Sequence, residues 1–161
     1  MARWIRFEHR SHTRIGVLEG DDIVVYQGEL FGDVRRTDEV VRLDEIDVLP
    51  PCLPTKMIGL ANNSRTLTEK QGTPAPDFPH YFIKPSNTFV PCGATIRDPG
   101  GHVKRVFYEA ELGIVLGKEC RQVAAGEAGD YIFGYTCVND VTAFQLLDDC
   151  PHFPQWTRQG L

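Results

Sequence analysis

Two closely spaced glutamates and one aspartate are the residues of this chain whose types and spacing could do chemistry. Glu109 and Glu111 belong to the run YEAELGIVLG at 108–117, where apolar residues alternate with them at every second position. A strand with this pattern would bury its apolar face and hold both carboxylates side by side on the other, where their repulsion calls for a compensating cation, basic side chain or water. Asp140 follows the end of a second apolar run at 131–138, a usual place for a functional group on a rigid scaffold.

Carboxylate oxygens from two adjacent strands suit a hard divalent cation. Three such donors would bind Mg²⁺ or Mn²⁺ and leave coordination positions open for a substrate. The pattern Glu-x-Glu is also common on strands whose polar face is simply solvated. The spacing by itself therefore leaves both a metal site and a solvated strand face open.

The composition predicts a globular protein of the cytoplasm. The 161 residues are 42% hydrophobic and 24% charged, enough for a sizeable core, and the net charge of −5 argues against a nucleic-acid-binding function. No apolar stretch approaches the roughly 20 residues that span a bilayer, and the first residues lack the apolar segment of a signal peptide. The five cysteines are scattered without a C-x-x-C pair, so we expect free thiols in a reducing compartment.

The chain divides into two predicted domains at a proline-rich segment, PPCLP at 50–54. Residues 1–52 form a small β-rich N-terminal domain with a hairpin at 14–27, because β-branched runs flank the turn signal Gly-Asp-Asp. Residues 53–161 form the second domain. Its expected elements are strands at 56–60, 80–84, 108–117 and 131–138, a short helix or ordered loop at 61–72, a brief surface helix at 122–130, and a helix at 142–149.

Four motifs, in this order, resemble the fumarylacetoacetate hydrolase family, which includes decarboxylases and isomerases of aromatic catabolism. The motifs are FIKPS at 82–86, YEAEL at 108–112, GYTCVNDVTA at 134–143 and WTR at 156–158. The resemblance implies an α+β, mainly β fold, in which a mixed β-roll that is incomplete at the C-terminus follows the small N-terminal domain. It also implies that Glu109, Glu111 and Asp140 hold a divalent cation, Mg²⁺ or Mn²⁺ and possibly Ca²⁺.

The chemistry implied by the resemblance is that of 2-oxo or 1,3-dicarbonyl acids, which react through an enolate. A cation at the substrate oxygen stabilises the charge that develops there. Lys84 is then expected to contact a substrate carboxylate or enolate oxygen, and Glu69 to carry a proton. Without the family pattern, Lys84 would be an exposed lysine at a strand end and Glu69 a solvated surface glutamate.

Two departures from the family pattern concern catalytic side chains. Hydrolytic members activate water with a His–Glu dyad, and here Thr66 stands where the histidine belongs while Glu69 aligns with the acid. A threonine hydroxyl is no base at neutral pH, and the nearest histidine, His80, is expected to pack at a strand start. Phe144 stands where the family has an arginine for the substrate carboxylate. We therefore expect decarboxylation or isomerisation rather than hydrolytic C–C cleavage.

A third departure is length, because the family continues where this chain stops at Leu161. The apolar residues Phe153 and Trp156 lie close to that end, so we expect either a longer natural polypeptide or burial against a second subunit, such as a homodimer partner. The alternative function is a catalytically silent family member with a structural or regulatory role. The lost histidine, the lost arginine and the incomplete roll all favour that alternative.

Overall fold

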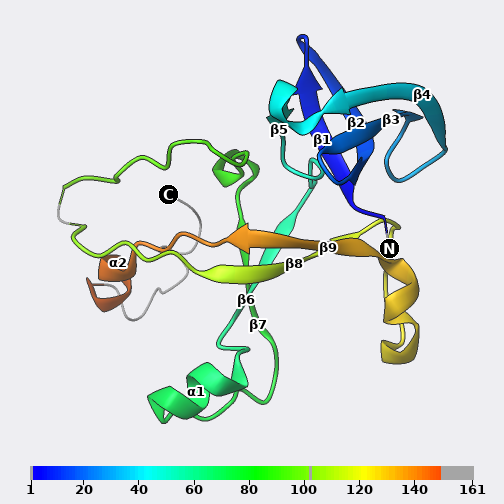
Figure 1. Ribbon diagram of the computed structural model, residues 1–161. Coiled ribbons are helices and arrows are strands. Elements are labelled where there is room, and N and C mark those ends of the chain that lie inside the picture. The colour runs from blue at the N-terminus through cyan, green and yellow to red at the C-terminus, as the bar shows by residue number, and fades with distance from the viewer. Residues whose placement is uncertain (1, 102, 150–161) are drawn as a thin grey trace. The chain divides into compact units, whose positions relative to one another are not determined.

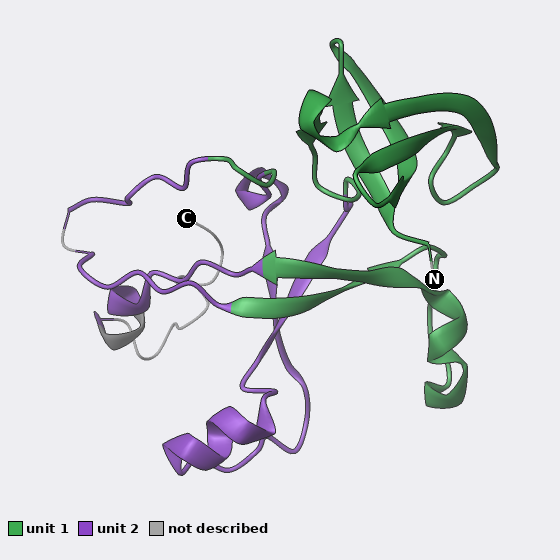
Figure 2. Cartoon of the chain, viewed as in Figure 1, with its two compact units in different colours: residues 1–53, 91–94, 110–138 green, residues 54–90, 95–109, 139–161 purple. Residues whose placement is uncertain are grey.

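A computed structural model describes residues 2–101 and 103–149, so the WTR motif, Cys150 and the apolar residues near the end of the chain lie outside the described residues. The described chain is mainly β (Figure 1). Among these residues, no helix is both long and apolar enough to cross a bilayer. The structure separates into two compact units, shown in different colours in Figure 2. One unit comprises Met1–Leu53, Pro91–Ala94 and Ala110–Val138, and the other Pro54–Val90, Thr95–Glu109 and Asn139–Leu161.

A five-stranded antiparallel sheet makes up most of the first unit, in the order β4-β3-β2-β1-β5. Its strands are β1 (Trp4–His9), β2 (His12–Glu19), β3 (Asp22–Gly28), β4 (Val34–Arg42) and β5 (Asp47–Val48), with a 3₁₀ turn η1 at Leu43–Glu45. The hairpin expected at 14–27 is therefore present as β2 and β3. A two-residue turn joins these strands, and Gly20 adopts a φ of 67° there, which glycine tolerates without strain.

The core of this sheet is a small apolar cluster. Phe7 and Ile23 are fully buried, and Val25 and Val41 are 4% exposed. Strand β2 has a glycine, Gly16, opposite this cluster, because a Cβ at this position would come within 2.6 Å of the Ile23 side chain. Close approach of β2 to β3 therefore depends on this glycine.

The first unit also contains the strand that carries Glu111. Strand β8 (Ala110–Leu116) pairs with β9 (Ile132–Asn139), and a 3₁₀ turn η3 (Ala125–Tyr131) precedes β9. The expected strand at 108–117 thus begins at Ala110, so Glu109 lies just before it. Cys137, which the apolar run predicts to be packed inside its strand, is exposed.

The second unit holds the antiparallel pair β6 (Met57–Ala61) and β7 (His80–Lys84), the 3₁₀ turn η2 (Ser86–Thr88), and the helices α1 (Arg65–Gln71) and α2 (Phe144–Asp149). Helix α1 begins at an N-cap, Ser64, whose hydroxyl accepts the Leu67 N–H at 3.3 Å. It ends at Gly72, which adopts the left-handed conformation with φ 64°. The segment expected to be a helix or a loop is therefore a capped helix.

One face of the β6–β7 pair is apolar and exposed. The register pairs Ile58 with Ile83 and Leu60 with Tyr81, and these four side chains are 47–70% exposed. On the opposite face the Phe82 ring lies over Gly59, where no Cβ could fit. This pair ends at Lys84, which positions the lysine for the site described next.

Candidate functional site

Asp140 is a buried carboxylate at the end of β9. It is the first residue after the strand and is 5% exposed. The Lys84 ammonium group, at the end of β7, forms an ion pair with Asp140 Oδ1, and the Lys84 side chain is 11% exposed. Besides this ammonium group, the buried Oδ1 has no partner among the described residues. A carboxylate with a single cationic partner still has lone pairs that a second cation could share.

Glu109 lies beside Asp140 and is held by three hydrogen bonds. Its backbone N–H donates to Asn139 Oδ1 at 3.2 Å, and its backbone carbonyl accepts the Asp140 N–H at 2.9 Å. Its side-chain Oε2 accepts the Thr142 hydroxyl at 2.7 Å. The segment after β9 therefore fixes both the backbone and the carboxylate of Glu109.

The described residues contain no group of three histidine, cysteine, aspartate or glutamate side chains arranged to hold a metal ion. Glu109 and Asp140 are neighbours through their backbones, whereas Glu111 lies in β8, in the other unit, and is exposed. Convergence of all three carboxylates on one cation therefore stays a prediction. The donors present nevertheless suit a hard cation, because they are carboxylate oxygens and the buried one already lies against a cationic group, the Lys84 ammonium.

The remaining predicted side chains lie on the second unit. Glu69 is exposed on α1, and Thr66 precedes it by three residues, so the two share one face of the helix. His80 lies at the start of β7 and pairs with Ala61, as expected, but its side chain is exposed rather than packed. Their roles stay predictions.

An arginine from a distant part of the sequence lies against Phe144, the residue that replaces the family's arginine. The Arg105 guanidinium lies over the Phe144 ring, 5.2 Å from its centroid, and the Phe107 ring stacks on Phe144 at 4.7 Å. Sequence reasoning noticed the lost charge at 144 but missed Arg105, because nothing in the sequence joins positions so far apart. Thr142 was also missed as a contact of Glu109, although it lies two residues after Asp140.

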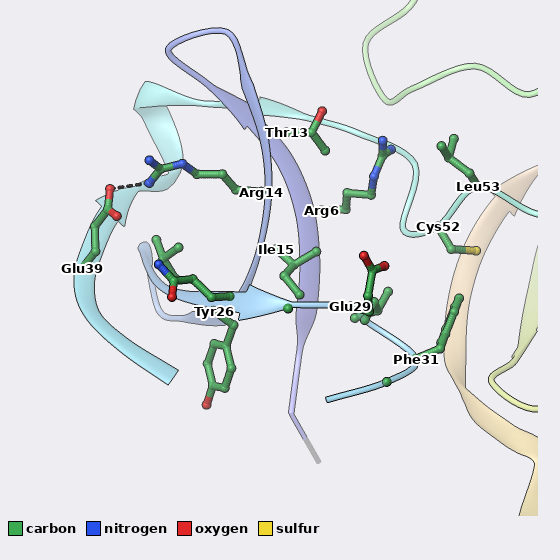
Figure 3. A pocket seen from close by; sticks show the side chains of 15 residues that line it. Arg6, Thr13, Arg14, Ile15, Tyr26, Glu29, Phe31, Glu39, Cys52 and Leu53 are labelled. Atoms are coloured by element: carbon green, nitrogen blue, oxygen red, sulfur yellow. Dashed lines mark hydrogen bonds and ion pairs between the residues drawn. The ribbon is translucent and has the colours of Figure 1, made fainter. Parts of the chain in front are cut away.

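A separate hollow of about 800 Å³ lies in the first unit (Figure 3). Apolar side chains such as Ile15, Phe31 and Leu53 line it together with Arg6, and none of the predicted metal ligands does. Cys52 also lines it, and burial raises the pKa of its thiol while the Arg6 charge opposes that shift. The thiol is therefore less readily ionised than a free one.

The family model described as fumarylacetoacetate (FAA) hydrolase C-terminal matches residues 56–160, about two thirds of the chain. The chain belongs to the fumarylacetoacetate hydrolase family. A second model, Rv2993c-like N-terminal, matches residues 2–51. The two matches meet near the predicted domain boundary at 52/53, while the compact units of the structure divide the chain differently, so that boundary stays a prediction.

Curated proteins from archaea and from animals are similar in sequence to this chain. An uncharacterised protein of Archaeoglobus fulgidus is 38% identical over 139 residues, which is 83% of this chain and 53% of the relative. The human mitochondrial oxaloacetate tautomerase FAHD1 is 40% identical over 72 residues, 45% of this chain and 32% of the tautomerase. The chain spans about half the length of the curated relatives it matches over most of its residues.

Solved structures of the family share the fold. A 2-hydroxyhepta-2,4-diene-1,7-dioate isomerase from Mycobacterium marinum, 27% identical, matches with a TM-score of 0.84 over 100% of this chain and 62% of its own. A maleylpyruvate hydrolase from Sphingobium, solved with manganese(II) and pyruvate, is 23% identical and matches with a TM-score of 0.66 over 88% of this chain and 56% of its own. The mainly β fold of the fumarylacetoacetate hydrolase family, with a β-rich N-terminal sheet, is confirmed.

Proposed function

We propose that this chain belongs to a divalent-metal-dependent enzyme that decarboxylates or isomerises a 2-oxo or 1,3-dicarbonyl acid. The observation that carries the proposal is the buried Asp140 carboxylate, whose Oδ1 has no partner among the described residues besides the Lys84 ammonium and whose backbone N–H donates to the Glu109 carbonyl. Its relatives include an isomerase, a tautomerase and a hydrolase. Because the chain spans only about half of its relatives' length, the activity is proposed for the protein to which the chain belongs.

Asp140, Glu109 and Glu111 would hold the cation, Mg²⁺ or Mn²⁺ and possibly Ca²⁺. When bound, it supplies a Lewis acid that stabilises the negative charge developing on a substrate oxygen. Manganese accompanies pyruvate in the related maleylpyruvate hydrolase structure, which supports a divalent cation and a 2-oxo acid here.

Lys84 and Glu69 have separate roles in the proposal. The Lys84 ammonium lies against Asp140, from where it donates hydrogen bonds to a substrate carboxylate or to the enolate oxygen. Glu69 carries a proton to or from the enolate carbon. With Thr66 in place of the dyad histidine, no strong base activates water, so C–C hydrolysis is disfavoured.

A metal titration with an enolisable acid tests the proposal. We expect the enol form of oxaloacetate to disappear faster with the protein and Mn²⁺ than with either alone. Asp140→Asn and Glu111→Gln should abolish that acceleration, and Glu119→Gln, which alters an exposed carboxylate outside the site, should keep it. Metal binding without turnover of oxaloacetate, acylpyruvates or related dicarbonyl acids would refute an enzymatic function.

That last outcome would support the alternative, a catalytically silent family member with a structural or regulatory role. Thr66 and Phe144 favour it, because each replaces a catalytic side chain of the family pattern. We also propose a cytoplasmic location and a homodimer. Size-exclusion chromatography with light scattering measures the oligomeric state.

A further inference from the structure

Thr142 is a buried residue whose position is fixed by the backbone. It is 2% exposed, and its N–H and carbonyl form a reciprocal pair of hydrogen bonds with Phe107, each 2.9 Å long. A β-branched side chain held in this way has few accessible rotamers. Its hydroxyl group therefore points in one direction.

That hydroxyl group donates a hydrogen bond to one oxygen of the Glu109 carboxylate. Thr142 Oγ1 donates to Glu109 Oε2 at 2.7 Å, a length typical of a good O–H···O bond. The Glu109 backbone is also held, by Asn139 and Asp140, so the carboxylate could present both oxygens to a ligand only by breaking the bond from Thr142. Oε1 is the oxygen that this arrangement leaves to a cation.

We propose that Thr142 is a positioning residue that restricts Glu109 to coordination through a single oxygen, and so favours Mg²⁺ and Mn²⁺ over Ca²⁺. The inference rests on the proposed function, in which Glu109 is a metal ligand. Ca²⁺ takes six to eight oxygen ligands and accepts carboxylates through both oxygens, whereas Mg²⁺ demands a near-ideal octahedron. A glutamate that coordinates through one oxygen therefore favours the six-coordinate Mg²⁺ over Ca²⁺, which accepts more ligand oxygens.

Thr142→Val removes the hydroxyl group and keeps the shape of the side chain. The backbone bonds to Phe107 do not involve the side chain, and Glu109 is exposed, so water can solvate its released oxygen. The carboxylate then becomes free to turn and to use both oxygens. Thr142→Ser is the matched control, because it keeps the hydroxyl group and loses only a methyl group.

Isothermal titration with Mn²⁺ and with Ca²⁺ tests the proposal on the wild-type chain and both variants. We expect Thr142→Val to bind Mn²⁺ at least about tenfold more weakly, as is typical when a hydrogen bond to a metal ligand is lost, while Ca²⁺ binding weakens less or strengthens. The ratio of Mn²⁺ to Ca²⁺ affinity should therefore fall in Thr142→Val and stay at the wild-type value in Thr142→Ser. A merely structural role would weaken both metals equally.

An unchanged affinity ratio in Thr142→Val, or an equal change in Thr142→Ser, would overturn the inference about Thr142. Failure of the proposed metal site itself would look different, because the wild-type chain would then bind neither cation or Asp140→Asn would bind both as well as wild type. Thermal melts show whether each variant is folded. If the valine variant is not, Thr142→Ala provides the same comparison without the larger side chain.

Discussion

Replacing Lys84 with methionine removes the ammonium group beside Asp140 and keeps a side chain of similar length. The Lys84 and Asp140 side chains are 11% and 5% exposed, so little water can reach the carboxylate to replace the lost charge. Two unit charges about 4 Å apart attract each other by about 4 kcal/mol at an effective dielectric constant of about 20. Breaking a buried pair from one side costs about 3–5 kcal/mol, so we expect the free energy of unfolding to fall by about 3 kcal/mol.

Urea denaturation at pH 7 measures this loss. With a slope of about 2 kcal/mol per molar urea, a loss of about 3 kcal/mol lowers the midpoint by about 1.5 M. The matched control is Lys70→Met, which alters an exposed lysine on α1 and should change the stability by no more than about 0.5 kcal/mol.

A double-mutant cycle identifies Asp140 as the partner. In Lys84→Met/Asp140→Asn both charges are gone, so the double variant should be more stable than the sum of the two single losses predicts, by at least about 1 kcal/mol. Additive losses, or a Lys84→Met loss no larger than that of Lys70→Met, would refute the buried ion pair as a source of stability.

Three further predictions follow from other residues. If Arg105, whose guanidinium lies over Phe144, supplies the charge of the family's missing arginine, Arg105→Ala should raise KM for dicarboxylic substrates more than for monocarboxylic ones in steady-state assays; equal effects would contradict this role. Ile58→Lys should reduce the fluorescence of a bound hydrophobic dye, since it places a charge on the exposed apolar face of β6–β7. Cys52 should react with iodoacetamide more slowly than the exposed Cys92, because burial raises its thiol pKa. The contribution of the Cys52 thiol to stability is fully present below its unfolded-state pKa of about 8.5, where the thiol is neutral. It is lost as the pH rises through the higher pKa of the thiol in the folded protein.

Local patterns predicted the elements because each element's sequence carries its own signal. Alternation and β-branched residues predicted β2 and β3, whereas the polar segment at 61–72 was compatible with a helix or a loop, and the Ser64 cap of α1 is known only from the structure. The start of β8 was placed two residues early, because the period-two pattern continues through Glu109 although the strand begins at Ala110. Periodicity identifies a strand more reliably than its first residue.

The sequence predicted which residues belong to the candidate site, but not which of them contact one another. Lys84 and Asp140 were both named from the sequence, yet their ion pair joins positions that lie 56 residues apart, which no local pattern reports. The hydrogen bond from Thr142 to Glu109 spans 33 residues and depends on the same missing information. Such contacts arise when strands pair, and a single sequence does not contain their register.

The last residue of β9 and the segment after it hold Glu109 at three points whose spacing along the chain is fixed. Asn139 holds its N–H, Asp140 its carbonyl and Thr142 its side chain, so three contacts depend on the spacing of three nearby residues. Substitution of Asn139 or Thr142 would lose one side-chain contact, whereas a single inserted or deleted residue between Asn139 and Thr142 would shift the contacts out of register. Related sequences should therefore vary in residue type along this segment more readily than in its length.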